Sequence, residues 1–187
     1  GAEHQIIPDR IEAGTFLIAG AIMGNEVTIT RAEPCHLKAV LDPLAEAGFL
    51  ISTGKDSVTL RSNGTGRPLK LETCPYPGFP TDMQAQMCAL LSTIDGISVI
   101  TETVFPQRFM HVAELKRMGA NIELEGSTAV INGVEKLSGA PVMASDLRAS
   151  AARITGLRRR LGEVEQPPIE VVRSADHEAL AREVAER

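Results

Sequence analysis

The chain has 187 residues, of which 43% are hydrophobic and 23% are charged, and its net charge is −5. These values are typical of one soluble globular domain and exclude a disordered or collagen-like chain. Only 3% of the residues are aromatic, which argues against a surface that stacks on single-stranded nucleic acid. The negative net charge also argues against a general nucleic-acid binder.

The cysteines and the apolar stretches indicate a protein of the reducing cytoplasm. Cys35, Cys74 and Cys88 form no CxxC pair and are odd in number, so we expect neither a disulfide framework nor a zinc site. The longest apolar stretch, Phe16–Met23, is much shorter than the roughly 20 residues that cross a bilayer. No membrane partner is therefore expected. The chain begins at Gly1 rather than at a methionine, which indicates a processed product or a piece of a larger protein.

Two stretches of the chain repeat one pattern at a constant offset of 71 residues. Val27–Thr30 corresponds to Ser98–Thr101, and Gly48 corresponds to Gly119, with no gap between the two matches. An offset held over this length predicts two copies of one structural unit. We place the units at about residues 4–63 and 69–134.

Each unit is predicted to contain an apolar buried helix, a β-branched strand, an amphipathic helix and a hairpin of two strands. In the first unit these elements are expected over residues 13–23, 26–30, 35–47, 49–52 and 57–61. In the second unit they are expected over residues 81–93, 97–101, 108–118, 121–125 and 129–132. Gly48 and Gly119 follow the amphipathic helices, in the position of a C-cap glycine. One further strand is expected before each unit.

A third unit begins at about residue 135 and is incomplete. Ala144–Ala151 aligns with Pro80–Met87 at an offset of 64, but the match ends near residue 152. Residues 153–187 are expected to form a divergent charged tail, a linker followed by a helix. The fold class predicted is therefore α/β, with repeated units whose helices are buried and whose sheets lie outside.

Two aspartates hold equivalent places at the start of expected buried helices. Asp82 follows Thr81, and Asp146 follows Ser145. One interpretation is structural, because a carboxylate in the first turn accepts hydrogen bonds from free backbone N–H groups. The other is functional, because a carboxylate at a helix mouth can orient or deprotonate a substrate hydroxyl. The pattern alone leaves both open.

Two arginines and one stiff loop accompany these aspartates. Arg148 lies near the start of the third unit's helix, where a guanidinium and the helix terminus together favour phosphate or carboxylate. Arg108 is expected to start the second unit's amphipathic helix. A surface ion pair for Arg148 and a solvated face for Arg108 are the structural alternatives. The segment Cys74–Asp82 contains three prolines and a glycine, which indicates a rigid loop that delivers Asp82 and serves binding.

No metal and no tightly bound cofactor is predicted. The histidines show no spacing typical of metal ligands, and they are His4, His36, His111 and His177. The chain also lacks a P-loop and a dinucleotide-binding glycine fingerprint.

Long, specific strings of residues resemble a known family. The strings are Asp9–Thr15, Pro77–Gln86, Thr101–Phe105, Arg108–Val112 and Ala144–Ala149. They are similar to motifs of the enolpyruvyl transferase family, and among its members to the UDP-N-acetylglucosamine 1-carboxyvinyltransferases. The resemblance covers about residues 1–152.

The resemblance implies a fold of two similar domains, each an inside-out barrel of three repeated α/β units. This chain would form most of one domain, over residues 1–152. The implied reaction transfers the enolpyruvyl group of phosphoenolpyruvate to the 3-hydroxyl of UDP-N-acetylglucosamine, in the synthesis of the peptidoglycan precursor. Both reactants are substrates, and the resemblance implies no cofactor.

The resemblance also implies roles for individual residues. Asp82 would hold, and could deprotonate, the sugar hydroxyl, and the backbone of Val104 would touch the nucleotide sugar. Arg148 would meet the enolpyruvyl or phosphate group with Asp146 beside it, and Arg108 would support the site. These residue types suit the reaction, since a hydroxyl nucleophile needs a base and an anionic substrate needs guanidinium groups.

The sequence also departs from the family pattern. The family places further substrate cations, an asparagine and a cysteine general acid in the other domain, and nothing in this chain matches them. We therefore expect the chain to supply one wall of the site, to be inactive alone and to need the missing domain as its partner. One alternative is a truncated paralogue that acts as a non-catalytic nucleotide-sugar-binding or interaction module. Another is an unstable remnant, because an incomplete third unit would leave apolar surface uncovered.

Overall fold

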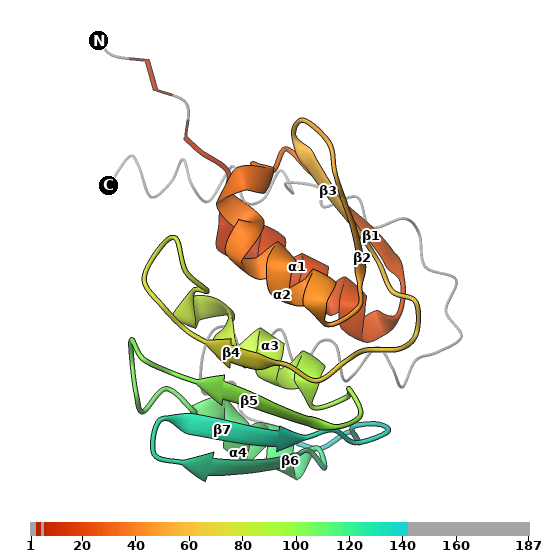
Figure 1. Cartoon of the computed structure of the whole chain (residues 1–187), viewed down its shortest axis with the longest axis vertical. Helices are drawn as coiled ribbons and strands as arrows, with labels where there is room; N and C mark the ends of the chain where they lie inside the picture. The colour runs from red at the N-terminus through yellow and green to blue at the C-terminus, as the bar shows by residue number, and fades with distance from the viewer. Residues whose placement is uncertain (1–2, 5, 142–187) are drawn as a thin grey trace.

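The computed structural model describes residues 3–4 and 6–141, and in it the first repeated unit folds as helices against a three-stranded sheet (Figure 1). Its elements are α1 (Arg10–Met23), β1 (Glu26–Thr30), the 3₁₀ helix η1 (Pro34–Leu37), α2 (Lys38–Glu46), β2 (Leu50–Thr53) and β3 (Ser57–Arg61). The sheet has the order β1-β3-β2, and both strand pairs are antiparallel. Val58 and Leu60 alternate with less buried residues along β3, so one face of the sheet is buried.

The second unit repeats this arrangement with one more strand. Its elements are β4 (Lys70–Glu72), the 3₁₀ helix η2 (Thr81–Met83), α3 (Gln84–Leu91), β5 (Ile97–Thr101), α4 (Met110–Arg117), β6 (Asn121–Glu125) and β7 (Thr128–Asn132). The sheet has the order β4-β5-β7-β6, in which β4 is parallel to β5 and the other pairs are antiparallel. A parallel pair needs a crossover connection, and α3 provides it.

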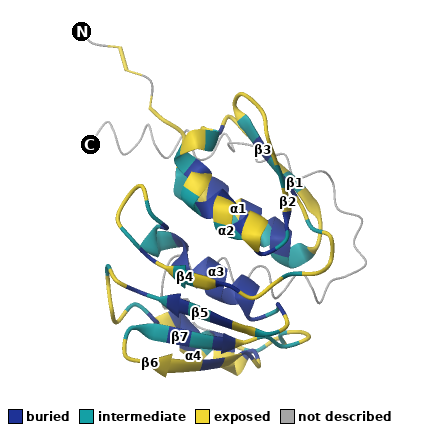
Figure 2. Cartoon of the chain, in the orientation of Figure 1, coloured by how far each residue is buried: buried dark blue, intermediate teal, exposed yellow. Residues whose placement is uncertain are grey.

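The helices lie inside and the sheets lie outside (Figure 1). Helices α1 and α2 contact the first sheet, α3 and α4 contact each other and the second sheet, and α1 contacts α3 between the two halves. Figure 2 shows buried residues along the helices, on α3 throughout, and at alternating positions of β3, β5 and β7. No helix in the described part of the chain is long and apolar enough to cross a membrane.

Helix α3 is buried along its whole length (Figure 2). Its two glutamines, Gln84 and Gln86, are only 1% and 3% exposed. The amide Nε2 of Gln86 donates to Thr15 Oγ1 on α1 at 2.9 Å, and Thr15 and Gln86 are 71 residues apart. The two buried helices therefore meet at equivalent positions of the repeat, which supports a symmetric arrangement of the two units around their shared core.

The amphipathic helices of the two units end in the same way. Gly48 has φ +97° and Gly119 has φ +91°, a left-handed conformation that glycine adopts without strain. The N–H of Gly48 donates to Ala45 O at 2.9 Å, and the next N–H donates to Leu44 O at 3.1 Å. Gly119 and the residue after it repeat this pattern on α4. This is the Schellman arrangement, and the C-cap glycines predicted from the sequence are confirmed.

Most predicted elements are found, with differences at their ends. The strands predicted over 26–30, 57–61, 97–101 and 121–125 match β1, β3, β5 and β6 without a shift. The buried helix predicted over 81–93 starts as a 3₁₀ turn and ends before Ser92. The Ser92 hydroxyl donates a hydrogen bond to Cys88 O at 2.7 Å. The strand expected before each unit is present as β4 in the second unit, but the described residues before α1 form none.

Candidate functional site

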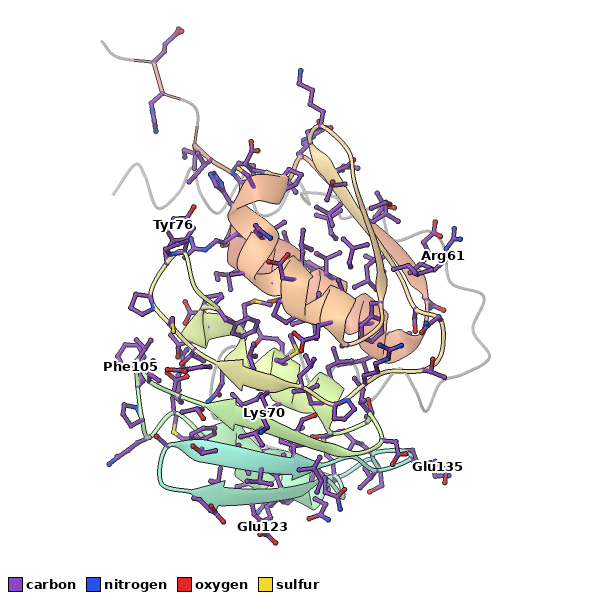
Figure 3. All side chains as sticks on the ribbon, in the orientation of Figure 1. Arg61, Lys70, Tyr76, Phe105, Glu123 and Glu135 are labelled. Carbon is purple, nitrogen blue, oxygen red and sulfur yellow. The ribbon has the colours of Figure 1, made fainter. Side chains whose placement is uncertain are left out.

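Two loops at one end of the second sheet carry the candidate site. The first loop follows β4 and spans residues 73–80, and the second follows β5 and spans residues 102–109. Tyr76 and Phe105 project from these loops at the same edge of the molecule (Figure 3). The first loop is closed on itself, since Cys74 N donates to Phe79 O and Gly78 N donates to Pro75 O, both at 2.8 Å. These bonds close the proline-containing loop, whose Tyr76–Pro77 bond is cis; its rigidity stays a prediction.

Asp82 and Arg108 meet between these loops. Arg108 Nη1 donates to Asp82 Oδ1 at 2.8 Å and to Thr81 Oγ1 at 3.3 Å. The two charged side chains are part-buried, at 20% exposure for Arg108 and 34% for Asp82. The Arg108 guanidinium also lies over the Phe105 ring, 5.9 Å from its centre. A carboxylate held in this way is accessible to a ligand and fixed in direction, since charge-assisted hydrogen bonds are short and directional.

Asp82 lies in the first turn of its helix and is not the N-cap residue, and its functional role stays a prediction. Asp82 is the second residue of η2, whose N-cap is Pro80 and which has no side-chain cap hydrogen bond. By contrast, Asp9 at the start of α1 does act as an N-cap, since its Oδ1 accepts from Ile11 N at 2.7 Å. The two units thus begin their buried helices with chemically different aspartates.

Glu102, which no sequence motif singled out, lies next to Asp82 and Arg108 through its bond to Thr81. Its side chain is fully buried and accepts hydrogen bonds from the hydroxyls of Thr73 and Thr81 at 2.7 and 2.9 Å. The backbone N–H groups of Val104 and Phe105 also donate to it, at 2.9 and 3.0 Å. Burial raises the pKa of this carboxyl, but the four hydrogen bonds outweigh burial and bring the pKa below its usual value.

Glu102 should make the stability of the fold depend on pH in the acid range. Because its pKa is lower in the folded chain than in the unfolded one, its contribution is full above about pH 4.3 and is lost as the pH falls through the folded pKa. The melting temperatures of wild type and Glu102→Gln should therefore converge as the pH is lowered from 6 to 3. Glu123→Gln, at an exposed residue of β6 (Figure 3), should give no such convergence. If the difference in melting temperature between wild type and Glu102→Gln stayed constant over this pH range, the expectation would be wrong.

The other predicted site residues fall in three places. Val104 is half-buried in the loop after β5. Arg108 was expected to start a helix but lies two residues before α4, where its N–H donates to Phe105 O in a turn at 2.9 Å. Asp146 and Arg148 lie outside the described residues, as do the tail over 153–187 and the part of the third unit after residue 141.

The cysteines and histidines form no site in the described residues. Cys88 is buried in the core, as predicted, and burial raises its pKa to about 12. Within residues 3–4 and 6–141, no three or more His, Cys, Asp or Glu side chains form a group that could hold a metal ion.

The repeat itself contains a signal that could have found Glu102. At an offset of 71, Glu102 corresponds to Arg31, Asp82 to Ile11 and Arg108 to Leu37. These three positions differ in charge or polarity between the units, so the cluster of Glu102, Asp82 and Arg108 has no counterpart at the equivalent positions of the first unit.

Two solved structures share this fold. The structure is similar to the enolpyruvyl transferase NikO from Streptomyces tendae, with a TM-score of 0.69 and 24% identity over 81% of this chain and 36% of that chain. It is also similar to EPSP synthase from Acinetobacter baumannii, with a TM-score of 0.61 and 18% identity over 83% of this chain and 38% of that chain. The fold is that of the enolpyruvyl transferases, and the predicted α/β fold of this class is confirmed.

The sequence comparisons narrow this class to a family. Residues 1–171 match the model of the EPSP synthase (3-phosphoshikimate 1-carboxyvinyltransferase) family, and the chain belongs to that family. It is 53% identical over 167 residues to the UDP-N-acetylglucosamine 1-carboxyvinyltransferase of Akkermansia muciniphila, covering 88% of this chain and 39% of the relative. It is 54% identical over 154 residues to the protein of the same name from Halorhodospira halophila, covering 82% and 37%. The resemblance seen in the sequence is confirmed, and the chain spans about two fifths of the length of these relatives.

Proposed function

We propose that the chain supplies one wall of the active site of a UDP-N-acetylglucosamine 1-carboxyvinyltransferase. The enzyme would transfer the enolpyruvyl group of phosphoenolpyruvate to the 3-hydroxyl of UDP-N-acetylglucosamine, in peptidoglycan precursor synthesis in the cytoplasm. The observation that carries this proposal is the part-exposed Asp82 carboxylate, held at 2.8 Å by Arg108 between the two loops. The names of the relatives at 53% and 54% identity support the choice of substrates.

Asp82 would orient the sugar hydroxyl and accept its proton. The hydroxyl oxygen would bond to the phosphoenolpyruvate carbon that bears the phosphate, while the O–H proton passes to the Asp82 carboxylate and a general acid of the second domain protonates the methylene carbon. Loss of a proton from the resulting methyl group, together with phosphate and its bonding electron pair, would then restore the double bond. Arg108 would keep the carboxylate aimed, since it contacts Asp82 and Thr81 together. Arg148, with Asp146 beside it, would bind the enolpyruvyl or phosphate group, because guanidinium groups match phosphate in charge and geometry.

Val104 would contact the nucleotide sugar through its backbone carbonyl. Its N–H already donates to Glu102 Oε1 at 2.9 Å. A backbone contact from this residue to a ligand would therefore accept a hydrogen bond, from a hydroxyl or an amide N–H of the sugar.

The proposed partner of the chain is the second domain of a full-length enzyme. The chain spans 39% and 37% of the relatives it matches, and the cleft of a two-domain enzyme has two walls. The general acid and the further substrate cations would come from that second domain, so the chain alone should bind the nucleotide sugar but not turn it over.

The test is isothermal titration of the chain with UDP-N-acetylglucosamine. Asp82→Ala should weaken binding by about 10- to 100-fold, because a hydrogen bond to a charged group contributes about 1.5–3 kcal/mol. Asp42→Ala is the matched control, since Asp42 forms an exposed ion pair with Lys38 on α2, far from the loops in sequence. It should change the dissociation constant by less than about twofold.

The outcomes of this titration separate the proposal from its alternatives. If both variants bind as the wild type does, Asp82 does not contact the sugar and the proposed site is wrong. Binding that depends on Asp82, without turnover after the second domain is added, would favour a non-catalytic nucleotide-sugar-binding module. The observation that favours this alternative is that the chain covers only 39% and 37% of the two relatives.

A further inference from the structure

The Glu102 carboxylate joins the three segments that build the candidate site. One of its oxygens accepts from Thr73 at the end of β4 and from the N–H groups of Val104 and Phe105 after β5. Its other oxygen accepts from Thr81 in η2. The side chain is fully buried, and its two oxygens accept four hydrogen bonds, three of them on one oxygen.

Two of these bonds, from Thr81 and Val104, lead to residues that have a role in the proposed function. The Thr81 hydroxyl, which donates to Glu102, accepts from Arg108 Nη1 at 3.3 Å and precedes Asp82 in the chain. The Val104 N–H is bound directly. Thr103 fastens the same loops a second time, since its N–H donates to Thr73 Oγ1 at 3.0 Å and its hydroxyl donates to Thr73 O.

The fold of a unit does not require this carboxylate. At the equivalent strand end of the first unit the residue is Arg31, which is exposed and has φ +55°. That unit forms its strand, its amphipathic helix and its hairpin without a buried charge there. Burying a carboxylate is costly unless its hydrogen bonds compensate. An uncharged residue would therefore serve a purely structural role at a smaller free-energy cost of burial.

We propose that Glu102 is a positioning residue that holds Thr81, Arg108 and Val104 in the arrangement that receives the nucleotide sugar, before the ligand arrives. Its oxygens set the direction of the Thr81 hydroxyl, which in turn fixes the Arg108 guanidinium against Asp82. The same carboxylate uses the Val104 N–H, which leaves the carbonyl of that residue for the ligand. The role in sugar binding rests on the proposed function, whereas the arrangement of the loops does not.

The experiment compares Glu102→Gln, Thr81→Val and Thr81→Ser in the chain, with Thr28→Val as control. Thr28 shares a hydroxyl–hydroxyl hydrogen bond with Thr59 on the first sheet, so the control loses one threonine hydroxyl away from the site. The first readout needs no ligand. It is the rate of hydrogen exchange of the Val104 and Phe105 amides and of the Arg108 guanidinium, followed by NMR. The second readout is the affinity for UDP-N-acetylglucosamine by titration.

Glu102→Gln replaces one acceptor oxygen with a donor, so it should speed exchange at one or more of these groups by at least about tenfold. Thr81→Val should speed exchange at Arg108 and leave the two amides within about twofold of wild type. Thr81→Ser, which keeps the hydroxyl, should restore the Arg108 rate. The affinity for the nucleotide sugar should fall by about tenfold in Glu102→Gln and Thr81→Val, and Thr81→Ser and Thr28→Val should bind like wild type.

The two readouts separate the failure of this inference from the failure of the proposed function. Unchanged exchange at all three groups in Glu102→Gln would overturn the positioning role, whether or not the sugar binds. So would a Thr81→Ser variant that behaves like Thr81→Val. If exchange changes as expected but the wild-type chain does not bind the sugar, the loop arrangement stands and the substrate assignment fails. If the loops loosen and the affinity does not change, the sugar assignment stands and the role of Glu102 in binding is overturned.

Discussion

Asp82→Asn is expected to lower the turnover of the full-length enzyme by about 10²–10⁴-fold, the range typical of a lost general base. Asparagine can still accept a hydrogen bond from the sugar hydroxyl through its carbonyl, but it cannot take up the proton. The variant should therefore lose far more in kcat than in KM, as expected when an interaction is made mainly in the transition state. Steady-state kinetics with both substrates, following phosphate release, would measure the two constants.

The matched control for this prediction is Asp9→Asn. Asp9 begins the buried helix of the first unit, as Asp82 does in the second, but it caps the helix by accepting from Ile11 N and Glu12 N. Asparagine caps a helix about as well as aspartate, so kcat should stay within about twofold of wild type. If Asp82→Asn instead raised KM and left kcat unchanged, Asp82 would bind the hydroxyl without taking its proton.

Gly133→Ala is expected to be among the most destabilising single substitutions in the described residues. Gly133 follows β7, and its N–H donates to Gly96 O at 2.9 Å. A Cβ atom at this position would overlap the carbonyl oxygen of Ile94 and lie 2.5 Å from its carbonyl carbon. The obstacle is backbone rather than a flexible side chain, so relief requires the turn before β5 to move. Urea unfolding should show a loss of about 3 kcal/mol or more.

Gly126→Ala separates this steric effect from the cost of backbone conformation. Gly126 lies in the β6–β7 turn with φ +60°, and no atom lies within 4 Å of a Cβ built there. Its replacement should cost about 1–2 kcal/mol, through the left-handed conformation alone. Equal losses for the two variants would mean that the contact with Ile94 relaxes freely, and would overturn the expectation for Gly133.

The strands could be predicted from the sequence because their signal is local. Glu26–Thr30 and Ile97–Thr101 are short β-branched segments between turn residues, and both match strands of the structure. The helix starts were less predictable. The second unit's buried helix opens as a 3₁₀ turn, Thr81–Met83, immediately after Pro80. The choice between 3₁₀ and α hydrogen bonds in a first turn depends on tertiary contacts, which sequence periodicity does not contain.

The site was only partly predictable for a related reason. The positions of Asp82 and Arg108 made them candidates and the family resemblance implied their roles, but their 2.8 Å contact depends on how the two loops pack. Glu102 was missed because a charged residue at a strand end normally faces solvent, whereas here four donors compensate its burial. Asp146 and Arg148 stay predictions, because they lie outside the described residues.

The shared helix ending shows how little sequence a repeated unit needs to keep. Between residues 35–49 and 106–120 the two units retain only two identical pairs, Leu44 with Leu115 and Gly48 with Gly119. Both leucines are buried, their carbonyls accept the outer bond of the Schellman arrangement, and the glycines make its left-handed turn. The remaining bonds of this reversal join backbone atoms, which every residue except proline provides. The other positions of the helix were therefore free to diverge, and the turn before α4 could carry Arg108 where the first unit has Leu37.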